Sequence, residues 1–397
     1  MAVNYKPPAF LPAVDGIRLG CTQAIKSKKR DDLTAMSIAP GAAVAGIFTR
    51  NLFAAPPVLL CREHLQAGGG NIRGLIINSG IANAGTLGRG MKDAQKSCRL
   101  FAALEGCRPR EVLPFSTGVI MEYLPMEKYA EGLQQCAKKM SADNWLAASR
   151  AIMTTDTVAK GAFRQINYRG KTFTVTGIAK GSGMIHPQMA TMLAFVATDA
   201  EVPPRRLATW QRAIASDSFN AVSVDGDTST NDSFMLIATG RAGKCNSELL
   251  KQAIAEVCNE LAEAIARDGE GATKFVTIRA HGASFTACRR VAEAVARSPL
   301  VKTALAAGDA NVGRFLMAIG NGGGGFRAQD VQMHIGGAPV IRNGGLHPRY
   351  DEQTATAALA GDEVSIDIKL GNGAHSATIK TCDLTRGYID INAAYRS

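Results

Sequence analysis

The hydroxyl of Thr191 stands at the head of an apolar run, in the stretch GMIHPQMATMLAF at residues 183–195. If the peptide bond between Ala190 and Thr191 is cleaved, Thr191 gains a free α-amine that titrates near neutral pH. That amine lies beside the Oγ of the same residue and can take its proton, which is one way to activate a hydroxyl nucleophile. The same hydroxyl could perform the cleavage by attacking the Ala190 carbonyl, leaving an ester that water opens. On these residues alone, a threonine buried in a strand stays the simpler interpretation.

Three other polar stretches could carry chemistry. Ser116-Thr117-Gly118-Val119 follows the apolar VLPF, and small residues after a strand can present backbone N–H groups to an oxyanion. From these residues alone, a plain turn is the better interpretation of this stretch. Lys180-Gly181-Ser182-Gly183 leads into the Thr191 segment. The stretch SVDGDTSTND at residues 223–232 is dense in Asp and hydroxyl groups; it fails the EF-hand spacing, so a cation site and a hydrogen-bonded turn both stay open.

Several common catalytic motifs are missing from the sequence. The glycine run at residues 320–325 is not followed by Lys-Ser or Lys-Thr, so it does not match a P-loop and is better interpreted as a turn. The six histidines include no pair at metal-ligand spacing, and His186 before Pro187 is typical of a loop. No GxSxG elbow of an α/β-hydrolase occurs.

Strand-like and helix-like runs alternate along the chain and would position these groups. The apolar runs that predict buried strands are AAVAGIFT (42–49), GLIINSG (74–80), FTVTGIA (173–179), TMLAFVAT (191–198) and KFVTIRA (274–280). The runs that predict helices are 89–105, 126–153, 247–266 and 286–308. Residues 330–382 are mostly β in pattern, and an irregular tail follows. The fold class is α/β or α+β, with a domain boundary near residue 285.

Composition excludes several classes of protein. With 397 residues, 46% of them apolar, the chain can bury a large core. No apolar stretch approaches the roughly 20 residues needed to span a bilayer, and the N-terminus lacks the pattern of a signal peptide. Nine cysteines without a CxxC pair indicate buried thiols in a reducing compartment. We therefore expect a soluble, cytoplasmic protein with no membrane partner.

The net charge of +11 does not indicate a nucleic-acid partner, because the charge is dispersed. The one basic cluster, Lys26–Arg30, is followed directly by Asp31 and Asp32, and no aromatic residues interleave with it. We expect this cluster to be a solvated loop. The net charge can still steer small acidic substrates toward the protein.

From about residue 13 to the C-terminus, the sequence resembles the ornithine acetyltransferases. These are bifunctional arginine-biosynthesis proteins, also called glutamate N-acetyltransferases. The resemblance rests on a series of collinear motifs: AGIFTRN, AAPPV, NSGIANA, STGVI, TTDT, AKGSGMIHPQMATML, SVDGDTSTND, EGATK, SPLVKTALAAGDANVGR and INAAYRS. Motifs of this length in this order are highly specific.

The resemblance implies roles for particular residues. Such proteins cleave themselves between the residues that match Ala190 and Thr191. Thr191 then takes acetyl from N2-acetylornithine, releases ornithine and passes the acetyl to glutamate, giving N-acetylglutamate. Thr117 and Gly118 are implied as the oxyanion hole. The implied substrate contacts are Thr154, Thr155, Lys180, Thr191, Glu270, Asn392 and Ser397.

The resemblance also implies an α/β fold with a layered αββα core, similar to that of the self-processing β-aminopeptidases. We expect residues 1–285 to form this catalytic core, cut into two chains between 190 and 191. Residues 286–380 would form a smaller C-terminal α/β domain, and residues 381–397 a tail that returns to the active site. The two chains stay together, as a heterotetramer of two cleaved pairs. No metal and no bound cofactor is implied.

Some residues depart from the family pattern and leave room for a different function. His186 and Gln188 replace residues that are more often Ala and Asn or Ser, GDANVGR lacks the usual Pro and Trp, and the tail carries Ala394 and Arg396 where an acid and a Thr are commoner. A paralogue in a specialised pathway is compatible with these departures. The sequence also admits a hydrolase or aminopeptidase with the same nucleophile, and an uncleaved protein that binds acidic amino acids. It leaves open whether acetyl-CoA is also a donor.

Overall fold

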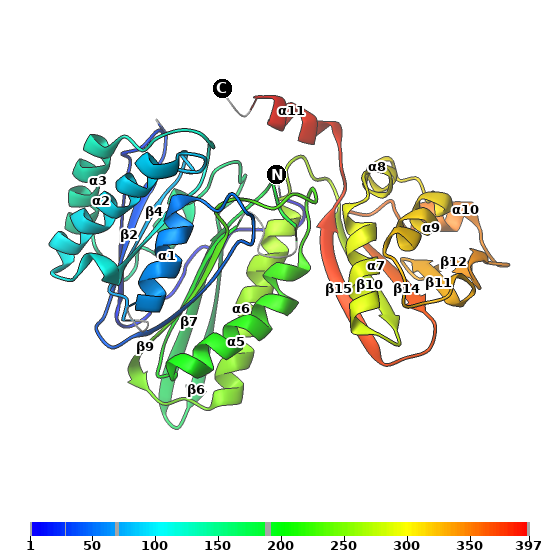
Figure 1. Ribbon diagram of the computed structural model, residues 1–397. Helices are drawn as coiled ribbons and strands as arrows, with labels where there is room; N and C mark the ends of the chain where they lie inside the picture. Colours follow the sequence, from blue (N-terminus) through cyan, green and yellow to red (C-terminus); the bar gives the residue numbers. More distant parts are fainter. Residues whose placement is uncertain (1, 28, 68–70, 187–191, 395–397) are drawn as a thin grey trace.

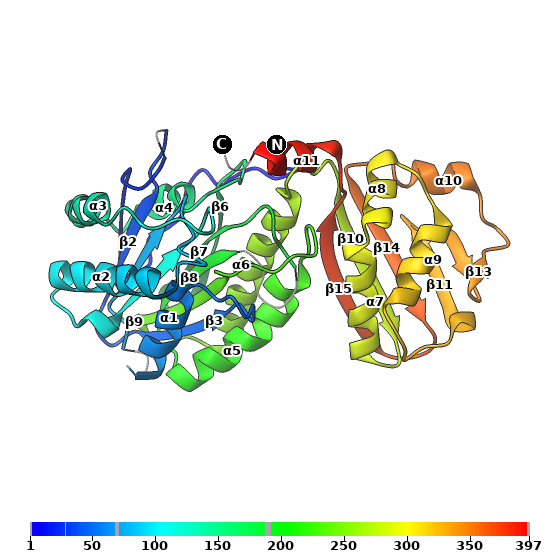
Figure 2. The ribbon, with the colours of Figure 1, turned by 45° about the horizontal axis from the view of Figure 1, so that its top comes forward.

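The computed structural model describes residues 2–27, 29–67, 71–186 and 192–394. It has two lobes, with the chain up to helix α6 in one and the segment from β10 to β15 in the other (Figure 1). The last helix, α11 (Arg386–Ala394), runs from the second lobe back over the junction between them (Figure 2). None of the described helices has a stretch long and apolar enough to cross a bilayer.

A four-stranded sheet lies on one side of the first lobe. Its strands are, in spatial order, β1 (Ile17–Thr22), β2 (Leu33–Ile38), β4 (Gly74–Asn78) and β5 (Val112–Ser116). Helix α2 (Leu87–Glu105) connects β4 to β5, which are parallel, and the other neighbours are antiparallel. Apolar side chains of α2 and of α3 (Met126–Lys138), among them Phe101 and Leu133, pack with Ile76 on the outer face of the sheet.

A five-stranded sheet lies on the other side. Its spatial order is β3 (Ala43–Phe48), β9 (Ser233–Gly243), β8 (Leu193–Ala200), β7 (Lys171–Lys180) and β6 (Lys160–Tyr168). Helices α5 (Pro204–Asp217) and α6 (Ser247–Arg267) cover its outer face, where Val257 and Leu261 of α6 pack with Val196 of β8. Helix α1 (Pro56–Ala67) follows β3 and contacts β5 and α2.

The two sheets pack face to face. Leu75 and Ile77 of the first sheet join Ile178 and Ile237 of the second in one buried cluster. Phe115 and Phe195 meet edge to face across it, with ring centroids 5.1 Å apart. Strand β8 is therefore covered on both faces, and all of its residues are buried, which explains its continuous apolar run. The expected αββα core is confirmed.

The second lobe is built on a six-stranded sheet. The spatial order of its strands is β13 (Gly345–Leu346), β12 (Ala338–Arg342), β11 (Val331–Ile335), β14 (Glu363–Leu370), β10 (Phe275–Gly282) and β15 (His375–Cys382). Its helices are α7 (Phe285–Arg297), α8 (Pro299–Ala307), α9 (Val312–Asn321) and α10 (Glu352–Ala357). Because β10 pairs with β14 and β15, we propose a domain boundary near residue 274, before β10, where the sequence pattern suggested 285.

Three expected elements differ in the structure. The helical run 126–153 is split into α3 and α4 (Trp145–Ala151), with the Asn144 amide donating to the Lys139 carbonyl at the break. The run 286–308 is split at Pro299, the first residue of α8, whose N-terminus is capped by Ser298. The expectation of an irregular tail is wrong, since α11 forms there. The Thr385 hydroxyl accepts a hydrogen bond from the Gly387 N–H in the first turn of α11.

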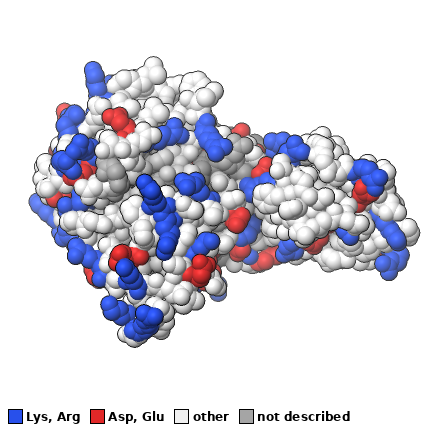
Figure 3. All heavy atoms as spheres, turned by 60° about the horizontal axis from the view of Figure 1, so that its bottom comes forward, with Lys and Arg blue, Asp and Glu red and all other residues white. Residues whose placement is uncertain are grey.

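The charged surface agrees with a dispersed net charge. On the face shown in Figure 3, Lys and Arg side chains are scattered among acidic and uncharged residues. Within the basic cluster at 26–30, Lys26 forms an ion pair with Glu122, and the Arg30 guanidinium donates to the backbone carbonyls of Met153 and Thr154. Two cations of this cluster, Lys26 and Arg30, thus already have partners within the protein.

Candidate active site

A cavity of about 90 Å³ lies where strands β5 and β7 end. Its walls come from segments that are far apart in the sequence. The lining residues are Ala82, Thr117, Gly118, Ile120, Thr154, Thr155, Lys180, Gly183, Met184, Ser229, Thr230, Asn231, Glu270 and Asn392. The two sheets pack against each other and helices cover their outer faces, so a small molecule can reach side chains at the end of the sandwich, where this cavity lies.

The cavity brings together most of the residues that the sequence singled out. Those at its wall are Thr117, Gly118, Thr154, Thr155, Lys180, Glu270 and Asn392. Those outside the described residues are Ala190, Thr191 and Ser397, as are Gln188 and Arg396. The chain enters β8 at Leu193, which pairs with Lys180, and the Met192 carbonyl accepts a hydrogen bond from the Ser233 N–H.

Thr117 and Gly118 directly follow β5 and form one wall. Gly118 has a φ of +130°, and a Cβ on it would lie 2.2 Å from the carbonyl carbon of Gly80, so only glycine fits this close approach. The Gly118 N–H makes no hydrogen bond to another described residue. The Thr117 hydroxyl accepts a hydrogen bond from the Lys180 ammonium at 3.2 Å. Since this oxygen acts as an acceptor, its own proton is left for the cavity.

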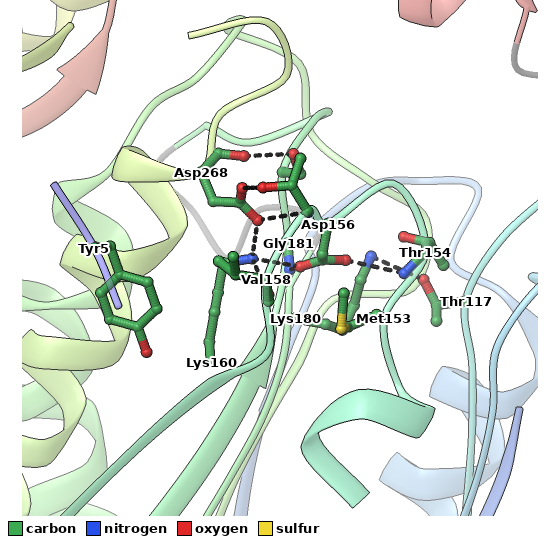
Figure 4. A network of polar contacts seen from close by, with 12 residues as sticks. Tyr5, Thr117, Met153, Thr154, Asp156, Val158, Lys160, Lys180, Gly181 and Asp268 are labelled. Atoms are coloured by element: carbon green, nitrogen blue, oxygen red, sulfur yellow. Dashed lines mark hydrogen bonds and ion pairs between the residues drawn. The ribbon is translucent and has the colours of Figure 1, made fainter. Parts of the chain in front are cut away.

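Lys180 ends β7 and is buried. Burial is the main influence on it and lowers its pKa, against which the negative charge of Asp156 acts. Asp156 accepts hydrogen bonds from the Thr154 and Gly181 N–H groups at 2.9 and 2.7 Å and lies 2.6 Å from the Lys160 ammonium (Figure 4). Burial alone would raise the pKa of Asp156, but the Lys160 and Lys180 charges outweigh it and hold that pKa below its usual range.

Glu270 and Asn392 form another part of the wall. The Asn392 amide, on α11, donates to the Glu270 carboxylate at 2.7 Å, and the Glu270 N–H donates to the Ser182 carbonyl. A Cβ on Gly183 would lie 2.4 Å from the Glu270 carboxyl carbon, so the glycine makes room for the acid. The cavity is therefore lined by both a cation, Lys180, and a carboxylate, Glu270, which suits a substrate that carries both charges.

The chain's relatives were identified by comparison with known proteins. The sequence model of the ArgJ family matches residues 18–397. The chain belongs to the ArgJ family. Membership identifies the protein as an acetyltransferase of arginine biosynthesis and confirms the resemblance seen in the motifs.

Solved structures similar to the chain include two of arginine-biosynthesis proteins. The arginine biosynthesis bifunctional protein argJ of Bacillus halodurans is 37% identical, with a TM-score of 0.48, over 51% of this chain and 98% of that one. The ornithine acetyltransferase of Mycobacterium tuberculosis, solved with ornithine, is 32% identical, with a TM-score of 0.39, over 46% and 96%. An L-aminopeptidase of Ochrobactrum anthropi, described as a variant of the Ntn-hydrolase fold, is 12% identical, with a TM-score of 0.38, over 68% and 90%.

The stretch 223–232 has a structural role at the site of this ArgJ-family protein. Asp225 accepts hydrogen bonds from the Met184 and Ile185 N–H groups, which fixes the segment that leads toward the expected cleavage position. Asn231 donates to the carbonyls of Ala82 and Ser116 and so ties two cavity loops together. Among the described residues, no group of three or more potential ligands could hold a metal ion. The hydrogen-bonded turn is thus the arrangement that the structure shows.

Two features of the site were not recognised from the sequence. One is the set of Asp156, Lys160 and Asp268, which are buried together (Figure 4). The other is Asp232, whose two carboxylate oxygens are buried and form no hydrogen bond with any described group. The Met192 and Ser229 N–H groups and the Thr49 hydroxyl lie near it without reaching hydrogen-bonding geometry. Burial raises the pKa of Asp232 well above its usual range.

Proposed function

We propose that this protein cleaves itself between Ala190 and Thr191 and then transfers acetyl from N2-acetyl-L-ornithine to L-glutamate through an ester on Thr191. The observation that supports this most is the cavity itself. Seven residues expected from the family resemblance, from separate chain segments, line one small cavity. The cavity-lining Lys180 pairs with Leu193, which is two positions after Thr191 in the chain.

Self-cleavage needs no other group as nucleophile. The Thr191 Oγ attacks the Ala190 carbonyl carbon, the Ala190–Thr191 C–N bond breaks, and the acyl group moves to oxygen as the nitrogen becomes an amine. Water then hydrolyses the ester and leaves a carboxylate on Ala190. The freed α-amine is the base for the later steps.

Acetyl transfer proceeds in two half-reactions. In the first, Thr191 Oγ attacks the acetyl carbonyl of the donor, and its proton passes to the α-amine and then to the leaving ornithine nitrogen. In the second, the glutamate amine attacks the acetyl ester, and its proton passes through the α-amine back to Thr191 Oγ. The Thr117 hydroxyl and the Gly118 N–H stabilise the oxyanion in each. An ammonium has three donors, so Lys180 can bind the substrate carboxylate while it donates to Thr117. Glu270 binds the substrate ammonium, with Thr154, Thr155, Asn392 and Ser397 as further contacts.

The two fragments should stay associated after cleavage. Strands β3, β7 and β6 belong to residues 1–190, while β8 and β9 belong to residues 191–397, and all five form one sheet in the order β3-β9-β8-β7-β6. The fragments cannot separate unless this sheet unfolds, so we propose that the working unit contains both, assembled as a heterotetramer of two such pairs. All nine cysteines are free, which supports a reducing, cytoplasmic location.

The test of this function is a product analysis. The purified protein is incubated with N2-acetylornithine and saturating glutamate, and ornithine, N-acetylglutamate and free acetate are measured. We expect N-acetylglutamate in near-equal amount to ornithine, and parallel initial-rate lines in double-reciprocal plots. Mostly free acetate would make the protein a hydrolase, and no turnover of either substrate would point to a paralogue with another substrate. A parallel incubation with acetyl-CoA and glutamate tests the second donor.

A further inference from the structure

A group of three buried charges lies directly behind the cavity. The Lys160 ammonium is 2.6 Å from an oxygen of Asp156 and 2.6 Å from an oxygen of Asp268, and all three side chains are at most 1% exposed (Figure 4). We call these three residues the buried charge triad. Two carboxylates and one ammonium leave a net negative charge, which is costly to bury unless further groups share it.

Asp156 shares its charge with the cavity wall. Besides Lys160, it accepts hydrogen bonds from the N–H groups of Thr154 and Gly181. Thr154 lines the cavity, and Gly181 directly follows Lys180, which also lines it. One carboxylate thus joins the loop before β6 to the end of β7 and fixes the backbone beside two expected substrate contacts.

Asp268 lies at the same distance, 2.6 Å, from the Lys160 ammonium. It accepts hydrogen bonds from the N–H and hydroxyl of Thr157. The ionisable groups with the largest effects on the pKa of Lys180 are Asp156, Lys160, Asp232 and Glu270, so the effect of Asp268 is smaller than theirs. The triad therefore contains one carboxylate with a large effect on Lys180 and one with a smaller effect.

The charge of Lys180 decides the direction of its hydrogen bond to Thr117. A charged ammonium can only donate, so the Thr117 hydroxyl accepts and its proton is available to an oxyanion in the cavity. A neutral amine can accept instead, and the Thr117 proton would then turn toward Lys180. Loss of the Lys180 proton would in this way remove one oxyanion donor.

We propose that Asp156 is a positioning residue for acetyl transfer, which acts by holding Thr154 and Lys180 in place and by keeping Lys180 in its charged, donating form. The proposal rests on the proposed function and deepens it. Asp156 touches no substrate; its effect passes through the Lys180 ammonium to the Thr117 hydroxyl. The Lys160 ammonium, 2.6 Å away, holds the Asp156 carboxylate in an orientation that serves both neighbours.

The sign of the pH effect follows from the charges around Lys180. Burial lowers the pKa of Lys180 most, the negative charge of Asp156 raises it, and the positive charge of Lys160 lowers it. Removing the Asp156 charge therefore lowers this pKa further, and activity should be lost at a lower pH. Removing Lys160 as well should shift the pKa back upward.

The experiment measures kcat and KM for acetyl transfer against pH on the self-cleaved protein and three variants. In Asp156→Asn, the fall of kcat on the alkaline side of its pH profile (the alkaline limb) should begin at a lower pH. At pH values above this fall, kcat should be lower by up to ~10²-fold, the effect of losing one oxyanion donor. The matched control, Asp268→Asn, also breaks a contact to Lys160, so it should lower the melting temperature but move the alkaline limb clearly less than Asp156→Asn does. The double variant Asp156→Asn, Lys160→Met should move the limb back toward that of the unmodified protein.

The proposal would be overturned if the alkaline limb of the kcat profile stayed in place in Asp156→Asn. It would also be overturned if Asp268→Asn shifted this limb as far as Asp156→Asn does. Either result would indicate that Asp156 has a purely structural role. If Asp156→Asn alone does not fold, the double variant is compared with the single variant Lys160→Met. The Asp156 change should again move the alkaline limb of the kcat profile to lower pH. The proposed function fails in a different way: the unmodified protein would then transfer no acetyl at any pH.

Discussion

The Asn392 amide of the C-terminal helix α11 donates a hydrogen bond to the carboxylate of Glu270, which follows helix α6, at 2.7 Å. The two residues are 122 positions apart. This bond, with that from the Tyr388 hydroxyl to Asp225, ties the C-terminal helix to the rim of the cavity. A segment that reads as an irregular tail therefore forms part of the candidate active site.

Replacing Asn392 by Ala should weaken substrate binding. The loss of a hydrogen bond to a charged carboxylate is expected to raise KM by about 10-fold, equivalent to roughly 1.5 kcal/mol, with a smaller change in kcat. Ile389→Ala is the control, because Ile389 lies on the same helix and is 65% exposed. Steady-state kinetics check this, and equal KM values in the two variants would remove Asn392 from the site.

Replacing Gly118 by Ala should reduce both stability and activity. The added Cβ would overlap the Gly80 backbone, and the positive φ disfavours any side chain, so the loop that carries the Thr117 hydroxyl and the Gly118 N–H must move. We expect kcat to fall by ~10²-fold. Gly88→Ala is the control, because no atom lies within 4 Å of a Cβ there and the residue is in helix α2. It should be stabilised by about 0.5–1 kcal/mol with unchanged kcat.

Thr117 should contribute through its hydroxyl alone. Thr117→Ala is expected to lower kcat by ~10²-fold or more with little change in KM, because the oxyanion forms only in the transition state. Thr117→Ser keeps the hydroxyl next to Lys180 and should recover most of the activity. A Thr117→Ala variant with normal kcat and raised KM would make Thr117 a substrate contact instead.

Much of the core could be predicted from apolar periodicity. In helix α6, Leu250, Ile254, Val257, Leu261 and Ile265 recur every three or four residues, and all are buried. The run KFVTIRA likewise becomes a strand, β10. Its sheet could not be predicted, because its parallel partner β14 begins 88 residues later at Glu363, and period-two patterns do not specify partners.

The roles of site residues could be predicted only for residues that belong to a recognisable sequence motif. Lys160 and Asp268 are 108 residues apart and belong to no shared pattern, so a surface role would be the default for each. Similarly, three aspartates occur in residues 223–232. Nothing in their order shows that the Asp225 carboxylate receives backbone hydrogen bonds, while the buried Asp232 carboxylate receives none from the described residues. Such differences arise from tertiary packing.

The buried carboxyl of Asp232 should lower stability as pH rises. Its pKa is raised in the folded chain, so the unfolded state ionises first and folding stability falls from about pH 4 upward, until the folded-state pKa is passed. In an uncleaved Thr191→Ala background, Asp232→Asn should therefore be more stable than its parent at pH 8, by on the order of 1–3 kcal/mol. The gain should vanish toward pH 4.

Urea unfolding at several pH values measures this difference. Asp143→Asn is the control, because Asp143 is exposed and its carboxylate makes no hydrogen bond among the described residues; it should show no pH-dependent gain. A loss of stability in Asp232→Asn at pH 8 would mean that the carboxylate is ionised and paired, contrary to its lack of a hydrogen-bond partner among the described residues.

The most direct test of the account is the mass of the protein before and after exposure to N2-acetylornithine alone. We expect two fragments, residues 1–190 and 191–397, and one acetyl group added to the second, with release of ornithine. Added glutamate should remove that acetyl group as N-acetylglutamate, much faster than water does. Thr191→Ala should stay a single, inactive chain. An intact chain in the unmodified active protein, efficient cleavage of Thr191→Ala, or turnover without an acetylated fragment would contradict a self-generated Thr191 nucleophile.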